Sequence, residues 1–261
     1  MPPPPPGRLA NVMRVSSMIW LGGSLHWKAF KESYRHHGVA GIFRFQEIHD
    51  AAVANLLSMT SDGFIAFENT TTVPSLVKCA TGRVLELGPG PGNQIHRYDP
   101  AQIEFVYAVD PNPHFAIDIA AKLQKVGGLD DKYKFIACGI EDSDVLRNEG
   151  ITEGSLDSIT SIQVMCAVDD VRPVMKEIYK LLKPGGKFVF WEHGRSKNTL
   201  TALAQALWNP AWYRFVGCSM TRDVKAGILA AGEWENPNDI KQSNDPYGFL
   251  PRVEGVLIKK I

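Results

Sequence analysis

The N-terminal third of the chain has the apolar spacing of helices. Residues 27–78 repeat apolar side chains every three or four positions, which predicts a helix lying on the core of a domain. The clearest stripe lies in "GIFRFQEIHDAAVANLLSM" and runs through Ile42, Phe45, Ile48, Ala52, Leu56 and Met59. The segment before it, "NVMRVSSMIWLGGSLHW", is interrupted by an arginine, two glycines and serines, so it falls short of the roughly 20 apolar residues of a membrane-spanning helix.

The pattern changes after Pro74. Short apolar runs, "RVLELG", "EFVYAVD", "YKFIACG", "LDSITSIQV" and "KFVFWEH", alternate with stretches of helical length. This alternation predicts a mostly parallel sheet with helices on both faces. We expect residues 1–80 to form a disordered proline-rich lead, "MPPPPPGR", followed by a helical cap or lid, and residues 81–261 to form the α/β domain.

Three glycines follow the first predicted strand at every second position. In "RVLELGPGPGN" they are Gly88, Gly90 and Gly92, with Glu86 just before them. A glycine turn between a strand and a helix lets a ligand lie against bare backbone, which indicates a nucleotide-like ligand. The spacing is G-x-G-x-G, whereas a dinucleotide fingerprint runs G-x-G-x-x-G.

The second predicted strand ends in an acid. In "FVYAVDPNPHF" this is Asp110, and a carboxylate at a strand tip can accept hydrogen bonds from both hydroxyls of a ribose. Together with the glycine turn, Asp110 resembles the class I S-adenosylmethionine-dependent methyltransferases. That resemblance implies a Rossmann-like sheet of seven strands, with the methionine part of the cofactor at the loop and the start of the following helix.

The second half of the chain carries a closer resemblance. "VDPNPHF", "IQVMCAVDD", "LLKPGGKFVFWEH", "WNPAWYRFVGCSMTRDV" and "PRVEGVLIKK" are similar to the membrane-associated alkyl-thiol methyltransferases, within the ubiquinone/menaquinone-type group. The likeness spans residues 83–260. Before it, the proline run and an interrupted apolar segment stand where that family has a hydrophobic membrane anchor, and the double proline of "GPGPG" also departs from the family.

The resemblance implies S-adenosylmethionine as the cofactor and Glu141-Asp142 near its adenine, although taken alone these two acids indicate a solvated turn. The residues expected to bind the cofactor are Glu86, Gly88, Gly90, Gly92, Asn93, Asp110, Pro111, Asn112, Glu141, Asp142 and Gln163.

The acceptor is expected at the carboxyl ends of the later strands. This position nominates Gln163, Met165 and Cys166 after the fourth strand and Glu192-His193 after the fifth. His193 is the candidate catalytic base, with a hydrogen-bonded residue that shapes the pocket as the alternative. The aromatic segment "LWNPAWYRFVGCSM" either walls an apolar acceptor pocket, with Arg214 or Arg222 orienting a polar substituent, or packs in the core.

The net charge and the positions of the cysteines argue against several other classes of protein. Lys+Arg and Asp+Glu number 28 each, so the formal net charge is zero. The protein therefore has no overall positive charge that would attract nucleic acid. The four cysteines are scattered without a CxxC pair, which argues against a disulfide framework and a zinc site and favours reduced thiols, and we expect no metal. No signal peptide is recognisable, so the expected location is cytoplasmic, with peripheral association at a membrane surface as an option.

The expected function is methyl transfer from S-adenosylmethionine to a small hydrophobic molecule. A thiol is the first choice because its reference pKa near 8.5 leaves some thiolate at neutral pH without a strong base. A hydroxyl compound is the second choice. The alternative is a methyltransferase fold that binds the cofactor but catalyses a rearrangement or cyclisation, or serves as a binding module.

Overall fold

The computed structural model describes residues 7–261, so the expected disorder of the proline run lies outside the described residues. Its centre is a seven-stranded sheet of order β3-β2-β1-β4-β5-β7-β6. The strands are β1 (Gly82–Leu87), β2 (Ile103–Val109), β3 (Tyr133–Ile136), β4 (Leu156–Ile162), β5 (Leu182–His193), β6 (Lys241–Gln242) and β7 (Arg252–Ile258). Strands β1 to β5 pair in parallel, and β7 is antiparallel to both β5 and β6. The predicted α/β class and the Rossmann-like sheet are confirmed.

Apolar cores fill both faces of this sheet, because successive side chains of a strand point to opposite sides. Phe188 and Phe190 of β5 join one core with α5 (Ser143–Asn148), α6 (Val171–Leu181) and α8 (Val224–Leu229). Trp191 joins the other core, which includes α3 (Val73–Val77) and α4 (Ala116–Val126). The helices therefore lie on both faces, as the alternating pattern predicts.

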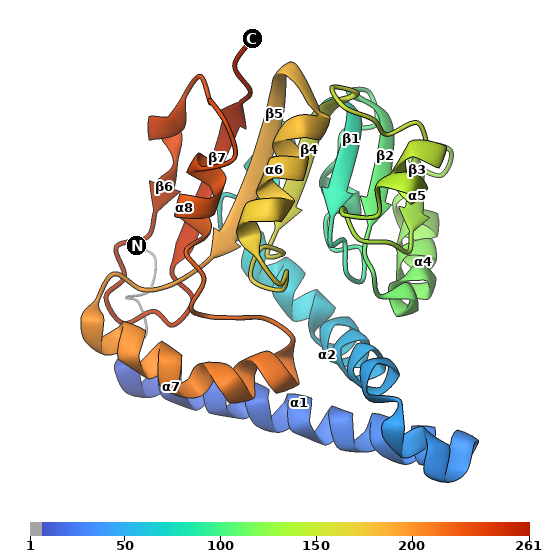
Figure 1. Ribbon diagram of the computed structural model, residues 1–261, viewed down its shortest axis with the longest axis vertical. Coiled ribbons are helices and arrows are strands. Elements are labelled where there is room, and N and C mark those ends of the chain that lie inside the picture. The colour runs from blue at the N-terminus through green and yellow to red at the C-terminus, as the bar shows by residue number, and fades with distance from the viewer. Residues whose placement is uncertain (1–6) are drawn as a thin grey trace.

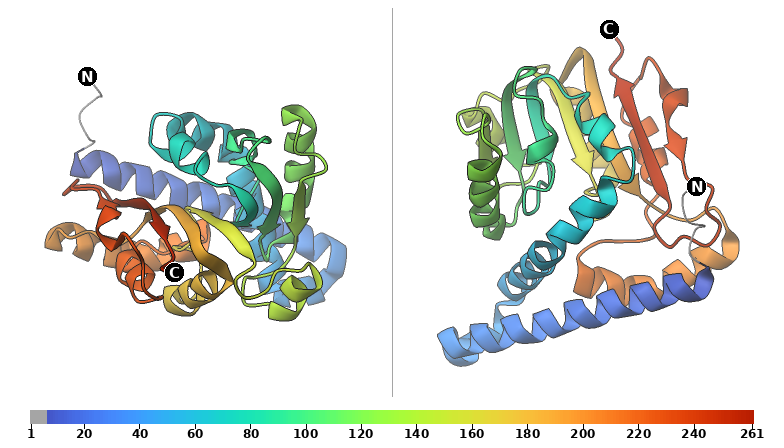
Figure 2. Two further views of the ribbon diagram at one scale, coloured as in Figure 1. Left: turned by 90° about the horizontal axis from the view of Figure 1, so that it is seen from above. Right: turned by 180° about the vertical axis from the view of Figure 1, so that it is seen from behind.

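Three long helices form a separate layer at one end of the sheet. They are α1 (Arg8–His37), α2 (Phe45–Glu68) and α7 (Thr199–Val216), and the short 3-10 helix η1 (Gly38–Phe43) joins the first two. Figure 1 shows α1 and α7 side by side, and the arrowheads of the parallel strands in Figure 2 point toward this layer. The cap thus faces the carboxyl ends of the strands, where open α/β sheets bind their ligands.

Two features of the cap concern its packing. The glycine pair of "WLGGSL", which interrupts the apolar run, lies inside the continuous helix α1, and Gly22 packs against the backbone of α7. A Cβ added at Gly22 would lie 2.1 Å from the carbonyl oxygen of Phe215, so glycine allows the two helices to approach closely. The predicted stripe on α2 is buried at Ile48, Ala52 and Leu56, but it is exposed at Phe45, the first residue of the helix, and at Met59 in its middle.

The remaining connections are short. The 3-10 helices η2 (Ile95–Arg97), η3 (Pro113–Phe115) and η4 (Pro237–Asp239) lie in loops. Side-chain caps start three of the α-helices. Asp170 accepts from the backbone N–H of Arg172 at α6, Asn198 accepts from that of Thr201 at α7, and Asp223 accepts from that of Ala226 at α8.

Candidate functional site

The loop after β1 leaves bare backbone at one glycine. Gly88, Gly90 and Gly92 all have positive φ angles of 52°, 52° and 79°, a region that side chains disfavour. A Cβ added at Gly88 would lie 2.8 Å from Val164, and one at Gly92 would lie 2.7 Å from Ile95. At Gly90 it would meet no atom within 4 Å. Gly88 and Gly92 therefore allow the protein to pack against itself, whereas Gly90 leaves open space.

The prediction of a helix directly after this loop is wrong. The chain makes a turn and only the three-residue η2, Ile95–Arg97, before it reaches β2. Pro89 and Pro91 lack the amide hydrogens of a first helical turn, and Gly90 and Gly92 have positive φ angles that an α-helix does not allow. Any ligand at the loop therefore meets turn backbone rather than the dipole of a long helix.

Asp110 lies at the tip of β2, next to the glycine loop. Its carboxylate is nearly buried and accepts a hydrogen bond of 2.9 Å from the backbone N–H of Asn112. Burial raises the pKa of Asp110 to about 6, although the backbone amides of Asn112 and Gly90 oppose that rise by hydrogen bonding. The loop and the strand tip thus place an acceptor carboxylate beside the open backbone of Gly90.

Glu86 is buried in the sheet two residues before the loop. The hydroxyl of Tyr133 donates to its Oε2 at 2.8 Å, and its Oε1 is buried without a hydrogen-bond partner among residues 7–261. Burial raises the pKa of Glu86 to about 7. Glu86 is therefore a buried carboxyl group inside the sheet, directly before the glycine loop.

Helix α2 is fastened across the ends of the strands. The Asn112 side chain donates to the carbonyl of Asp50 at 2.9 Å, and Ser61 donates to the Asn93 side chain at 2.6 Å. Asn112 follows β2 and Asn93 follows β1, so α2 passes over both strand ends. These two asparagines, expected at the cofactor, use these side-chain atoms to hold the cap.

The last residue of α2 joins both halves of the sheet. Glu68 is 1% exposed and forms an ion pair of 2.7 Å with Arg97, which follows the glycine loop. Its other oxygen accepts from the Gln163 side chain at 3.0 Å, and Gln163 in turn accepts from Arg252 at 3.0 Å. Gln94 also donates to Glu68. This buried network links the loop after β1 to the end of β4.

Gln163 has unusual backbone geometry. Its φ angle is 63°, and it is the one non-glycine residue with positive φ in the described chain. Side chains rarely adopt that region, and such strain gathers at functional sites. The sequence nominated Gln163 but gave no sign of Glu68, because one acid at the end of an apolar stripe looks like an ordinary exposed residue.

Three expected cofactor positions lie on the surface. Glu141 and Asp142 are both exposed after β3, and Asp142 accepts a hydrogen bond of 2.8 Å from the backbone N–H of Gly139. Asp142 therefore shapes the turn that follows the strand. Pro111 is also exposed, directly beside Asp110.

The end of β5 is tied to the end of β4 by a buried carboxylate. Glu192 accepts hydrogen bonds from the Ser161 hydroxyl at 2.7 Å and from the backbone amides of Val164 and Met165 at 3.0 and 3.1 Å. Burial raises the pKa of Glu192 to about 7. Met165 is completely buried and its side chain packs in the core on one face of the sheet.

His193 faces two cysteines at this strand end. Its Nε2 lies 3.7 Å from the Cys218 sulfur, which also accepts from the Trp212 indole N–H at 3.1 Å. Cys166, after β4, lies in the same cluster. The sequence placed His193 and Cys166 near the acceptor, and it offered Cys218 only as part of the aromatic segment that either walls the acceptor pocket or packs in the core.

The aromatic segment of α7 packs in the cap. Trp212 is buried, and the Phe215 ring meets the edge of the His26 ring at 5.4 Å between centroids. Arg214 donates to His49 of α2 at 3.2 Å. These contacts support core packing over a pocket wall for these residues.

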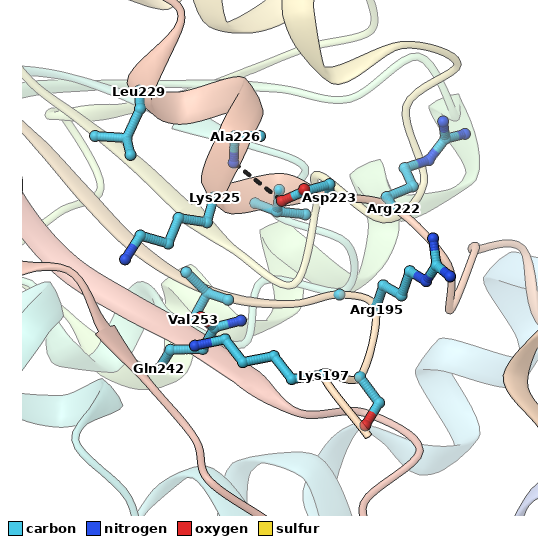
Figure 3. A pocket seen from close by; sticks show the side chains of 12 residues that line it. Arg195, Lys197, Arg222, Asp223, Lys225, Ala226, Leu229, Gln242 and Val253 are labelled. Atoms are coloured by element: carbon cyan, nitrogen blue, oxygen red, sulfur yellow. Dashed lines mark hydrogen bonds between the residues drawn. The ribbon is translucent and has the colours of Figure 1, made fainter. Parts of the chain in front are cut away.

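A pocket of about 430 Å³ lies on the flank of the sheet, between the end of β5, α8 and β7. Figure 3 shows that basic side chains gather around it: Arg195, Lys197, Arg222 and Lys225, beside Asp223. Arg222 already donates to the carbonyls of Cys166 and Asp169. The pocket contains neither the glycine loop nor Asp110.

Comparison with known proteins shows which proteins the chain is similar to. Residues 85–190 match the family described as "Methyltransferase domain". Thiol S-methyltransferase TMT1B of Rattus norvegicus is 29% identical over 176 residues, which cover 64% of this chain and 66% of that protein. The Homo sapiens protein of the same name is 32% identical over 149 residues, covering 56% and 58%. The chain thus spans less than two thirds of these relatives.

Solved structures agree on the fold. An O-methyltransferase family protein from Burkholderia thailandensis superposes with a TM-score of 0.58 at 13% identity, covering 93% of this chain and 71% of that one. The strand order, the glycine loop, the matched domain and the relatives agree: the sheet is the one that the class I methyltransferase resemblance implies, residues 85–190 match a methyltransferase domain, and the chain is similar in sequence to proteins named thiol S-methyltransferases.

Proposed function

We propose that the protein transfers the methyl group of S-adenosylmethionine to the thiol of a small hydrophobic acceptor. The observation that carries this proposal is the open backbone of Gly90 beside the buried carboxylate of Asp110. The choice of a thiol is supported by the relatives that are named thiol S-methyltransferases.

In this proposal the residues of the glycine loop divide the work of binding. Asp110 accepts hydrogen bonds from the ribose hydroxyls, and Gly90 lets the cofactor approach the backbone. Asn93 and Asn112 act indirectly, because their side chains hold α2 over the loops. Glu86 supports the loop from below, as a buried carboxyl group directly before it.

The remaining candidates contribute from the rim and from the acceptor side. Pro111, Glu141 and Asp142 are exposed, and we assign them to the open edge of the cofactor site, toward the adenine. Gln163 lies between the cofactor and the acceptor, held by Glu68 and Arg252. In this position its strained backbone fixes the boundary between the two ligands.

Methyl transfer from a sulfonium is an in-line displacement, so alignment and exclusion of water carry most of the catalysis. The layer of α1, α2 and α7 suits this task because it covers the carboxyl ends of the strands. A thiol acceptor asks little of a general base. A hydroxyl acceptor would ask more, and His193 at the end of β5 is the observation that keeps hydroxyl compounds as second candidates.

The test is a panel of acceptors. Purified protein is incubated with S-adenosylmethionine and alkyl thiols, phenols or amines of similar size, and S-adenosylhomocysteine is measured. We expect product with the thiols. Product with amines alone would contradict the thiol assignment, and binding of the cofactor without any S-adenosylhomocysteine would favour a rearrangement or a binding role.

We further propose that the protein associates peripherally with membrane surfaces through α1. Exposed apolar side chains form one stripe along this helix: Leu9, Met13, Trp20, Trp27 and Tyr34. Their spacing of four or seven residues keeps them on one face. The helix also carries Arg8, Arg14, Lys28, Lys31 and Arg35 but a single acid, Glu32. Basic helices with an apolar aromatic face bind anionic bilayer surfaces.

None of the helices within residues 7–261 is long and apolar enough to cross a bilayer. Sedimentation with vesicles of phosphatidylcholine and phosphatidylserine tests the surface proposal. We expect the double variant Trp20→Asp, Trp27→Asp to bind at least tenfold more weakly than the wild type. The control is Ile117→Asp, which changes an 81% exposed residue on α4. Equal binding of all three proteins, or none by the wild type, would contradict it.

A further inference from the structure

Three side chains of a kind that binds metals meet at the ends of β4 and β5. Cys166 follows β4, His193 ends β5, and Cys218 follows α7. The two sulfurs and one ring nitrogen all lie within 4.8 Å of one another. The three residues come from separate segments, and the fold alone brings them together.

The cluster is buried, and the ring nitrogens of its histidine have few hydrogen-bond partners in the protein. Cys166 and His193 are almost completely buried, and Cys218 is partly buried. The Nδ1 of His193 has no hydrogen-bond partner in the described chain, and its Nε2 faces only the weakly polar Cys218 sulfur at 3.7 Å. A buried imidazole normally has strong partners on its ring nitrogens. This one lacks the contacts that hold a purely structural histidine.

The distance between the Cys218 sulfur and the His193 ring nitrogen suits a tetrahedral ion. Zinc binds thiolate sulfur at about 2.3 Å and imidazole nitrogen at about 2.0–2.1 Å, which places the two ligand atoms about 3.6 Å apart. The observed separation of the Cys218 sulfur and the His193 nitrogen is 3.7 Å. The Trp212 indole N–H donates to the Cys218 sulfur at 3.1 Å, as outer partners of metal ligands do.

We propose that Cys166, His193 and Cys218 bind a zinc(II) ion. Two thiolates and one imidazole balance the charge of the ion, and soft sulfur donors favour zinc over magnesium or calcium. Three protein ligands leave a fourth position, which is the donor count of catalytic rather than structural zinc sites. The absence of a CxxC pair concealed this donor set in the sequence.

The fourth position gives the site a role, which rests on the proposed thiol methylation. The acceptor thiol binds there through sulfur and releases its proton to solvent. A lone pair of the bound sulfur then forms the new bond to the methyl carbon, while the bond from that carbon to the sulfonium of the cofactor breaks and leaves S-adenosylhomocysteine. Zinc prefers sulfur and lowers the pKa of a bound thiol, so this arrangement selects thiols over hydroxyl compounds.

Metal content and cobalt(II) binding test the site without any measurement of activity. The full chain is purified under reducing conditions and its zinc is counted. Apoprotein prepared with a chelator is then titrated with cobalt(II). We expect one equivalent of metal and the charge-transfer absorption of cobalt–thiolate bonds. Cys166→Ser and Cys218→Ser should each weaken cobalt binding at least tenfold, whereas Cys138→Ser, a buried cysteine after β3, should not.

Several results would overturn the assignment. The first is wild-type protein that holds no stoichiometric metal or shows no cobalt–thiolate band. The second is equal cobalt binding by all three serine variants. The third is a Cys166–Cys218 disulfide that persists under reducing conditions in place of metal. A variant that fails to fold is recognised by circular dichroism, and the wild-type measurements then decide alone.

A small alkyl thiol added to the cobalt protein probes the fourth position. We expect the visible cobalt bands to shift, and unchanged bands would overturn the proposed role in acceptor binding. This experiment also separates the two proposals. Metal binding without any thiol methylation would contradict the proposed function and leave the zinc site standing, whereas thiol methylation by metal-free protein would do the reverse.

Discussion

The two halves of the candidate site are built in different ways. The half expected to bind the cofactor comes from neighbouring segments, since Gly90 follows β1 and Asp110 follows β2, the next strand along the chain and its direct partner in the sheet. The half expected to bind the acceptor collects Cys166, His193 and Cys218 from three distant segments. A motif records the first arrangement, whereas the second exists only once the chain has folded.

The largest expected effect is a loss of stability when the buried ion pair that links the two halves, Glu68–Arg97, is removed. Glu68→Ala should lower the free energy of unfolding by about 3–5 kcal/mol, because it leaves the buried Arg97 without its ion-pair partner. Denaturation by urea measures the change. The control is Glu47→Ala, whose ion pair with Arg44 is exposed and should contribute about 0–1 kcal/mol. Similar losses in both variants would show that the buried network does not hold the halves together.

Gly90→Val tests the cofactor half more sharply. The added side chain enters open space where we place the cofactor, so S-adenosylmethionine should bind at least about 100-fold more weakly, or about 2.7 kcal/mol. Gly154→Val is the matched control, because its φ angle is also positive, at 61°, and its Cβ would also meet nothing within 4 Å. Calorimetry measures binding and circular dichroism checks folding. Retained affinity in a folded Gly90→Val protein is the adverse result.

Asp110→Ala should weaken cofactor binding at least tenfold, equal to about 1.4 kcal/mol, because the ribose hydroxyls lose their acceptor. The same variant should leave cobalt(II) binding unchanged, since the metal cluster lies at the other half of the site. Calorimetry and cobalt titration of one preparation give both numbers. An unchanged cofactor affinity would remove Asp110 from the site, and a parallel loss of both ligands would show that the halves are not independent.

The smallest expected effect is a pH dependence of cofactor affinity. The pKa of Asp110 is raised to about 6, so its carboxylate is ionised above that pH and becomes protonated below it. A protonated carboxyl group is a weaker acceptor for two hydroxyls, and affinity should therefore fall, by about tenfold at most, from about pH 7.5 to about pH 5. In Asp110→Asn this step should be absent. A step of the same size in that variant would assign the titration to another group.

Much of the fold could be predicted from the pattern of apolar residues. Alternating strands and helices indicated the sheet, and the five parallel strands lie where their apolar runs are. The cofactor half could be nominated because Gly88, Gly90, Gly92 and Asp110 follow strands that are neighbours in the sheet. Their separate roles could not be predicted, since only the packing of Val164 and Ile95 distinguishes Gly88 and Gly92 from Gly90.

Other parts depended on long-range contacts. The sequence indicated a helix after the glycine loop, but the chain forms turns and only the three-residue η2 there. The burial of Glu68 and its bridge from Arg97 to Gln163 have no sequence signal, because charge alone does not show which acid is removed from water. The continuity of α1 through Gly22 likewise depends on the backbone of α7.

By itself, the sequence determined the order of the parallel strands along the chain, the glycine turn and the acid at the tip of β2, because these depend on residues close together along the chain. Only the tertiary structure decided which loops α2 covers and which cysteines meet His193. Those contacts arise when whole helices pack across the sheet, and their distances depend on the packing of the side chains between them. Cys218 and His193 are therefore neighbours in space for a reason that no local pattern contains.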